Sequence, residues 1–413
     1  MTIRFTTPLL LTCLWLPGTL VAQQARGLTL EECVALAQQN NARIKSSQYQ
    51  IEFSRESRKA ASDLGRASAT LMRGQYNSLY TDNNLTVGQS IPFPTTIIRQ
   101  FQLGAEQILG AEQFLKVQQN SLVYEVRSAY YHLLYLEAQS KLLVAQDSLY
   151  ENFFRVASAR FRTGESTLLE RTSAESQWLE IKNQVRVNAS DIAIAENQLR
   201  VLLQIDERVH ASEVLHKRQF ALLSDTALSQ NPEIQWWAQQ VKISAASHKV
   251  ERSKIMPDLM VGGFVQSLTG VQNINGIDTF FPSSRKFTGF QFGLSIPLWI
   301  RPQIARARSA AIQEKIASTN ANHFYVVLRG TFEQGLQETA KNNASLAYFE
   351  ESALVNAALL LDQAMKSFQK GEIEYFEYLQ ALRQSFGIRS GHLLALNLYN
   401  QSVIKLEFIA GSF

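Results

Sequence analysis

The sequence predicts a mainly helical protein that also carries membrane β-strands, organised as two tandem repeats of helix, strand, strand, long helix, turn and helix. Three observations predict this class. No proline lies between Pro94 and Pro232 or after Pro302, so two very long helical tracts are possible. Apolar residues in both tracts recur at steps of four and three, the stripe of a helix packed against other helices. Ser-Ile-Pro occurs twice, at Ser90–Pro92 and Ser295–Pro297, each time between a segment of alternating apolar residues and a proline-free tract.

The first 22 residues are typical of a secretory signal. Met1–Ala22 has a basic residue at Arg4, an apolar body and small residues before a polar stretch. Pro8 and Pro17 interrupt the apolar body, which argues against a membrane-spanning helix. The chain is therefore expected to leave the cytoplasm. Cys33 is then its only cysteine, so no internal disulfide framework is expected.

The sequence carries no signature of a nucleic-acid-binding protein or of an enzyme. The formal net charge is +4, without a basic tail or a charge block. None of the six histidines stands three or four residues from another histidine or a cysteine, and no phosphate loop, nucleophile elbow or dinucleotide fingerprint occurs. We therefore predict no catalytic residue, no metal site, no cofactor and no nucleic-acid partner.

Four strands are predicted from the period of the apolar residues. From Phe290 to Leu298 apolar residues alternate with small or polar ones, as in a strand with one apolar face. The stretch before Pro92 alternates in the same way, with Gln89 as a flaw, and the upstream partners alternate more weakly. The expected strands are about 67–77, 85–93, 258–268 and 287–298, with loops at 78–84 and 269–286.

The strands match outer-membrane barrel segments, which have about ten residues and aromatic side chains toward their ends. A small soluble sheet packed on the helices is the alternative, which a single copy of the pattern would favour. A lipid-facing strand needs all its backbone groups paired, so the sheet must close. Because four strands cannot close a barrel, several chains are expected to share one.

Each proline-free tract is expected to form a helical hairpin with one glycine turn. The arm Thr95–Arg160 would span about 100 Å as a continuous helix. The tracts break at 161–167 and 368–374, where Gly164 and Gly371 follow basic residues, as at many helix ends. Arms of this length suit a rod or a tunnel.

The two repeats are expected to cover residues 23–205 and 226–413, joined by a connection at 206–225. Asn41-Ala-Arg-Ile corresponds to Asn231-Pro-Glu-Ile near the start of each repeat. Each repeat thus passes from one strand hairpin to one helical hairpin.

These residues resemble the family of TolC-like outer-membrane efflux proteins. The first helix LTLEECVALAQQNNARI and its second copy ALSQNPEI resemble the family's, as do the turns RFRTGESTLLERTSAES and SFQKGEIEYFEYLQA. The resemblance covers roughly Leu28 to Phe413. It implies a homotrimer in which a 12-strand barrel in the outer membrane continues into a 12-helix barrel in the periplasm. It also implies a passive duct that contacts outer-membrane lipid, a periplasmic adaptor and an inner-membrane transporter, for which the resistance-nodulation-division type is one candidate.

The resemblance places adaptor contacts at the two glycine turns. The matching residues are Arg160, Phe161, Gly164, Glu165, Phe368, Gly371 and Glu372. The glycines also serve simply as good turn formers, and the two interpretations are compatible.

The resemblance also places acidic residues at a constricted periplasmic mouth. Glu170 and Glu377 stand at the matching positions, whereas Gln380 stands where relatives carry a second acid. A cation-binding acidic ring at that level is therefore not implied, although three copies of both glutamates would still crowd carboxylates at the mouth. Crowded carboxylates attract cations and favour a narrow, cation-sensitive entrance. The alternative is that both acids are solvated and placed by the helix dipole.

Two other classes compete with the duct. A periplasmic coiled-coil adaptor or structural protein without a pore would share the signal and the hairpins, but would not need two strand pairs at equivalent places. A secreted enzyme with helical decoration would need a site that the sequence does not offer. The cargo stays open among metal ions, drugs and polypeptides.

Overall fold

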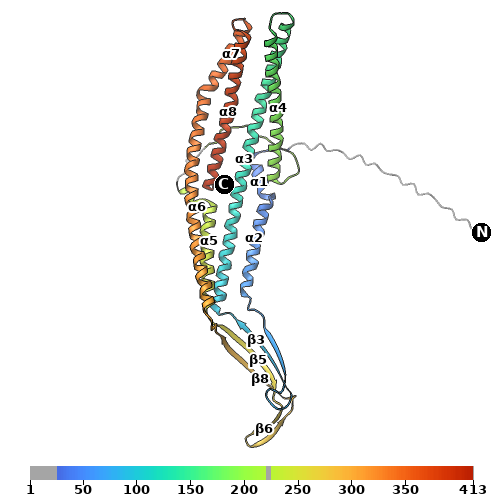
Figure 1. The fold of residues 1–413 in the computed structure, drawn as a ribbon, viewed down its shortest axis with the longest axis vertical. Coiled ribbons are helices and arrows are strands. Elements are labelled where there is room, and N and C mark those ends of the chain that lie inside the picture. Colours follow the sequence, from blue (N-terminus) through green and yellow to red (C-terminus); the bar gives the residue numbers. More distant parts are fainter. Residues whose placement is uncertain (1–25, 220–224, 413) are drawn as a thin grey trace, which may run out of the picture.

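The computed structural model describes residues 26–219 and 225–412, and the predicted secretory signal lies outside these described residues. The molecule is a long rod (Figure 1). The strands of the main sheet lie at one end, and the two helical hairpins turn at the other end. The rod therefore has a sheet end and a helical tip.

Eight α-helices are described in the resolved ranges: α1 Leu30–Asn40, α2 Ala42–Lys59, α3 Pro94–Arg162, α4 Leu168–Leu203, α5 Pro232–Ser253, α6 Arg301–Tyr348, α7 Leu354–Gln369 and α8 Tyr375–Ala410. The strands are β1 Arg26–Leu28, β2 Ser68–Gly74, β3 Asp82–Ile91, β4 Val209–Ala211, β5 Asp258–Ser267, β6 Gly270–Ile274, β7 Ile277–Phe281 and β8 Lys286–Ser295. Short 3₁₀ turns lie at Ala60–Ser62 and Asp225–Gln230, and a π-turn lies at Phe349–Ala353.

Helix α3 confirms the expected long arm. It contains 69 residues, which corresponds to about 100 Å at 1.5 Å per residue. It packs against α2 and α5 toward the sheet and against α4 and α8 toward the tip. Helices α5 and α8 in turn pack against α6, and α7 packs against α8. The helices thus form one layer, with α2 and α4 along one edge and α6 and α7 along the other.

The main sheet is antiparallel throughout, in the order β2-β3-β5-β8. The central pairing of β3 with β5 joins the two repeats. The outer sides of β2 and β8 have no partner strand in the described chain. The sheet is therefore open at both edges.

Residues that face each other across neighbouring strands share one face of a sheet, so the register defines two faces. One face is apolar: Leu71, Leu85, Val87, Ile91, Leu259, Val261, Val265, Phe290, Phe292 and Leu294. The other face is mainly small and polar: Ser68, Thr70, Asn84, Thr86, Gly88, Ser90, Gly262, Gln266, Gly289, Gln291 and Gly293. Phe290 and Phe292 are 86% and 83% exposed in the single chain. This is the division expected of lipid-facing strands around a polar lumen.

Gln89, which interrupts the apolar alternation of β3, lies on the apolar face beside Val261. Its Nε2 atom donates to the backbone oxygens of Leu64 and Gly65, both at 3.4 Å, in the segment that leads into β2. The amide therefore has backbone partners at the helix end of the sheet.

The expectation of a loop at 269–286 was wrong, because this segment contains the hairpin of β6 and β7. Asn275 and Gly276 form its turn with φ of 52° and 86°. Asn-Gly between two apolar segments is the strongest short hairpin signal, since both residues adopt positive φ easily. The sequence therefore contained this signal at Ile274–Ile277, and the expectation of a loop missed it.

The second long helical arm also differs from the expected continuous helix. The π-turn at Phe349–Ala353 separates α6 from α7. The ring of Phe349 lies against Gly391 of α8, where an added Cβ would come within 2.9 Å of the ring. The extra residue of the π-turn thus occurs where an aromatic side chain packs against a glycine of the neighbouring helix.

The middle of the rod contains the largest core, around a two-stranded parallel sheet that the sequence did not predict. Strand β1 pairs with β4 of the connection between the repeats, and each has three residues, too few to show a period. Tyr130 is fully buried, and its hydroxyl donates to the backbone oxygen of Leu28 at 2.9 Å. Tyr130 and its neighbour Tyr131 thus serve helix packing. Cys33 is also buried here as a free thiol.

Glu407 of α8 fixes the connection between the repeats to the helices. Its carboxylate accepts hydrogen bonds from Arg218 of the connection at 3.0 and 2.9 Å, and from Arg127 of α3 at 3.1 Å. Asn400 of α8 donates to the backbone oxygen of His216 at 2.8 Å. These contacts cross between segments far apart in the sequence, so they orient one repeat against the other.

Candidate functional site at the helical tip

Helix α3 ends in a Schellman turn. Gly164 adopts a φ of 77°, a conformation that glycine enters without steric cost. Its N–H donates to the oxygen of Phe161 at 3.2 Å, and the N–H of Glu165 donates to the oxygen of Arg160 at 2.9 Å. These two bonds satisfy carbonyl groups that the end of a helix leaves free.

Helix α7 ends in the same turn. Gly371 adopts a φ of 73°. Its N–H donates to Phe368 at 3.1 Å, and the N–H of Glu372 donates to Ser367 at 2.9 Å. Both predicted glycine turns are therefore confirmed, and they share one hydrogen-bond pattern.

The returning helices α4 and α8 begin with side-chain caps. The hydroxyl oxygen of Thr167 accepts a hydrogen bond from the N–H of Glu170 at 3.2 Å. In the second turn, Glu374 and Glu377 form a capping box, in which the Glu377 carboxylate accepts from the N–H of Glu374 at 3.3 Å. The Glu377 side chain thus caps the start of α8.

An aromatic cluster joins the two hairpins just below the turns. Phe153 of α3 stacks on Tyr375 of α8 with ring centres 4.5 Å apart, and Phe368 stacks on Tyr378 at 4.7 Å. Burial raises the pKa of the Tyr375 hydroxyl, and the carboxylate of Glu170 adds to the rise. The buried Tyr375 oxygen has no hydrogen-bond partner in the described chain. The tip is therefore held together mainly by ring packing.

A cavity of about 1190 Å³ lies between the two turns. It brings together five of the predicted residues: Arg160, Glu165, Glu170, Phe368 and Gly371. Sequence reasoning missed further residues that line it, among them Leu169, Lys370, Glu374, Tyr375 and Phe376. Leu169 and Phe376 are 78% and 70% exposed. The sequence signal for Leu169 and Phe376 was an apolar residue in the first turn of a helix. The structure shows that no core covers either side chain.

The other predicted tip residues lie outside the lining of this cavity. Phe161 is half-buried, with the guanidinium of Arg171 5.9 Å from its ring centre. Glu372 accepts from the hydroxyl of Ser367 at 3.0 Å. The side chains of Glu377 and Gln380 are exposed. The cavity of the single chain is therefore lined by Glu170 but not by Glu372, Glu377 or Gln380.

The two strand-to-helix corners differ more than their shared sequence predicts. At the first corner, β3 ends at Ile91, just after Ser90, and α3 begins at Pro94, two residues beyond Pro92. At the second corner, β8 ends at Ser295, and α6 begins only at Arg301, beyond Pro297. The second corner is therefore a longer link.

Strand hairpins that continue into paired helical hairpins are also the fold of several solved outer-membrane channels. Solved structures share this fold across almost the whole chain. CusC matches with a TM-score of 0.76 and 16% identity over 94% of both chains. The CmeC channel of Campylobacter jejuni matches with a TM-score of 0.76 and 15% identity over 92% of this chain and 85% of that one. VceC of Vibrio cholerae matches with a TM-score of 0.73 and 16% identity over 92% of this chain and 96% of that one.

The family model described as outer membrane efflux protein matches residues 223–412. This match covers the second part of the chain, and the whole chain shares its fold with solved outer-membrane channels. A search of curated proteins by sequence gave no match. The family match and the shared fold do not favour the alternative of a coiled-coil adaptor without a pore.

Proposed function

We propose that three copies of this chain form the passive exit duct of a tripartite efflux pump, with the sheet in the outer membrane and the helices in the periplasm. The observation that carries the proposal is the open sheet with one apolar and one polar face. In lipid, the free edges of β2 and β8 need partners, and three chains of four strands supply them in a 12-strand barrel.

The edges of the helical layer support the same assembly. On α4, exposed apolar residues recur about every seven positions: Leu179, Val187, Ile194 and Val201. On the opposite edge, Tyr348, Val355 and Leu359 are exposed. Such stripes are typical of a coiled-coil seam that lacks its partner. We expect α4 of one copy to pack beside α7 of the next, so that 12 helices close the tube.

We propose the tip cavity as the contact for a periplasmic adaptor, which would link the duct to an inner-membrane transporter. The cavity offers both charges, through Arg160 and Lys370 and through Glu165, Glu170 and Glu374. Exposed apolar residues beside these charges are suited to a protein partner. A transporter of the resistance-nodulation-division type remains a candidate, and the duct itself needs no catalytic residue or cofactor.

We also keep the constricted mouth as part of the proposal. Three copies each of Glu170 and Glu377 would surround the threefold axis, whereas Gln380 adds no charge. The proposed mouth is narrow and favours cations without being a metal site. The proposed repeats remain 23–205 and 226–413, with the signal removed near Ala22.

The test is the native mass of the mature chain extracted from the outer-membrane fraction in a mild detergent. We expect three copies in that fraction, and a mature N-terminus near residue 23. A soluble periplasmic monomer would contradict the shared barrel. It would instead support a periplasmic coiled-coil adaptor or structural protein without a pore.

A further inference from the structure

Cations gather where the helices meet the sheet. Exposed arginine and lysine side chains of α2, α5, α6 and the segment before β2 lie at this level, and we call them the basic junction surface: Arg58, Lys59, Arg66, Arg252, Lys254, Arg301, Arg306 and Arg308. Lys59 and Lys254 pair with acids of their own helices. The six arginines form no ion pair within the described chain.

The fold explains only part of this charge. Helices α2 and α5 end at the junction, so Arg58 and Arg252 lie in last turns, where cations suit the helix dipole. Helix α6 instead begins there, and cations near the start of a helix are unfavourable. Its first acid is Glu314, well after the three arginines. The charge at the start of α6 therefore has no explanation within its own helix.

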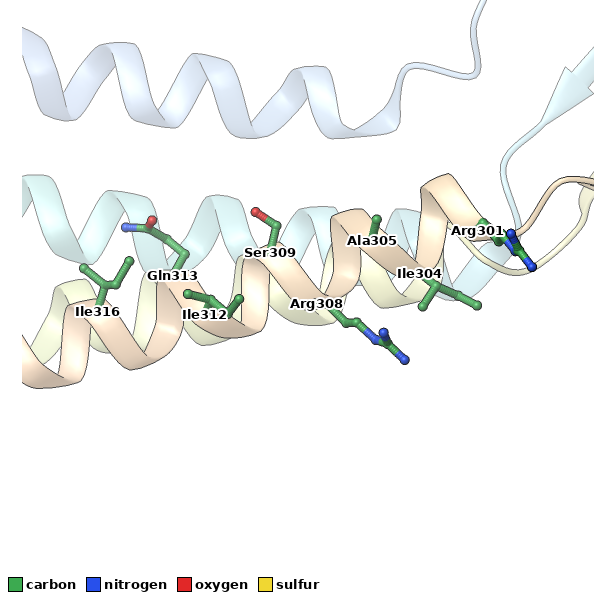
Figure 2. A pocket seen from close by; sticks show the side chains of 8 residues that line it. All are labelled: Arg301, Ile304, Ala305, Arg308, Ser309, Ile312, Gln313 and Ile316. Carbon is green, nitrogen blue, oxygen red and sulfur yellow. The ribbon is translucent and has the colours of Figure 1, made fainter.

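Arg301 and Arg308 lie two helical turns apart on the same face of α6, where they line an open hollow of about 670 Å³. Ile304 and Ile312 line the hollow with them. Figure 2 shows Ile304 and Arg308 extending away from the neighbouring helices. The hollow therefore offers two guanidinium groups separated by apolar surface.

The hollow lies at the level where the lipid-facing surface ends. The link between β8 and α6 exposes Leu298 and Trp299 at 87% and 84%. Tryptophan is enriched at membrane–water interfaces, and long cationic side chains reach from there to the headgroups. The basic junction surface would thus be level with the phosphates of the membrane leaflet nearest the helices.

We propose that the basic junction surface, with Arg301 and Arg308 at its centre, binds the phosphate groups of anionic phospholipids in the periplasmic leaflet of the outer membrane. The inference rests on the proposed orientation of the duct. A guanidinium pairs well with a phosphate, and a basic surface at the membrane attracts anionic lipid. The apolar residues of the hollow suit the start of the acyl chains.

A second copy is a weaker occupant for this hollow. If the tube closes with α6 beside α2 of the next copy, Arg301 and Arg308 approach the end of α2, where Arg58 and Lys59 lie. Like charges at close distance repel each other unless an anion lies between them. A lipid phosphate would supply that anion.

The test uses the full-length mature protein in non-ionic detergent, with phosphatidylglycerol or phosphatidylcholine of the same acyl chains added, and counts retained lipids by native mass spectrometry. We expect the wild-type trimer to retain phosphatidylglycerol preferentially. The variant R301Q/R308Q is expected to bind it roughly 25-fold more weakly, about fivefold for each lost charge. The control R329Q/K341Q removes two exposed cations of the same helix far from the junction and is expected to bind like the wild type.

Four results would overturn the inference. Equal retention of phosphatidylglycerol by R301Q/R308Q and wild type would remove these arginines from lipid binding. Loss of the trimer by the variant in lipid-free detergent would assign the surface to the contact between copies. Displacement of the lipid by an equal concentration of inorganic phosphate would show that the basic junction surface binds a free anion. A wild-type trimer without lipid preference contradicts this inference alone, whereas a wild-type monomer contradicts the proposed function.

Discussion

Gly164 and Gly371 occupy the same place in two Schellman turns, one at the end of each long helical arm, with φ of 77° and 73°. In both turns the glycine N–H bonds to the phenylalanine three residues earlier, at 3.2 and 3.1 Å. An added Cβ would meet no atom within 4 Å at either position. The glycines are therefore required by backbone conformation and not by a lack of space.

Gly164→Ala and Gly371→Ala are each expected to destabilise the helical tip by about 1–2 kcal/mol, since alanine is strained in the left-handed conformation. The measurement is the thermal midpoint of the helical circular dichroism signal. Gly330→Ala is the control, because Gly330 lies inside α6 with open space around it. The control should stabilise slightly, by about 0.5–1 kcal/mol. Equal midpoints for all three variants would refute the strain argument.

Charge and capping at Glu377 can be separated by two substitutions. Glu377→Ala removes the acceptor for the Glu374 N–H and should cost about 1 kcal/mol, whereas Glu377→Gln keeps an acceptor oxygen and should cost less. Both remove negative charge from the proposed mouth. Glu377→Ala is expected to widen the resting mouth, seen as larger single-channel conductance and antibiotic leakage. Unchanged conductance and leakage would limit Glu377 to its capping role.

The two faces of β8 should respond differently to a new charge. Phe292→Arg places a cation on the apolar face and is expected to cost about 2–4 kcal/mol of barrel stability at the bilayer midplane. Gln291→Arg places the same cation on the polar face and should be tolerated. For both variants, the measurement is the amount of folded trimer in the outer-membrane fraction, detected by its mobility in unheated gel samples. A tolerated Phe292→Arg would show that this face does not meet lipid.

The Glu407 ion-pair network should matter far more than a surface pair on the same helix. Glu407→Gln removes the negative charge that bonds both Arg127 and Arg218 and leaves these two cations close together, which is expected to cost roughly 3 kcal/mol. Lys405→Ala breaks the exposed pair with Glu338 and should cost less than about 1 kcal/mol. The measurement is the denaturant midpoint of each variant, which compares the two losses of stability. Similar losses would mean that the network does not fix the connection between the repeats.

The sequence alone determined the elements whose signal is local. The absence of proline and the four-three spacing determined the long helices, and Gly164 and Gly371 determined their turns, because backbone conformation and burial act on neighbouring residues. Alternation determined the strands, and their observed limits differ from the expected ones by a few residues. Asn275-Gly276 was equally local, so the hairpin of β6 and β7 was predictable and was missed.

Only the tertiary structure decided the features that depend on residues far apart in the chain. The pairing of β1 with β4, the π-turn opposite Gly391 and the network around Glu407 each depend on partners from distant segments, which a local pattern does not encode. The same is true of the tip: the sequence named Arg160 and Phe368, but the packing of Phe153 on Tyr375 decided that the two turns enclose one cavity. Local propensity thus determined what each segment forms, and long-range packing decided which side chains meet.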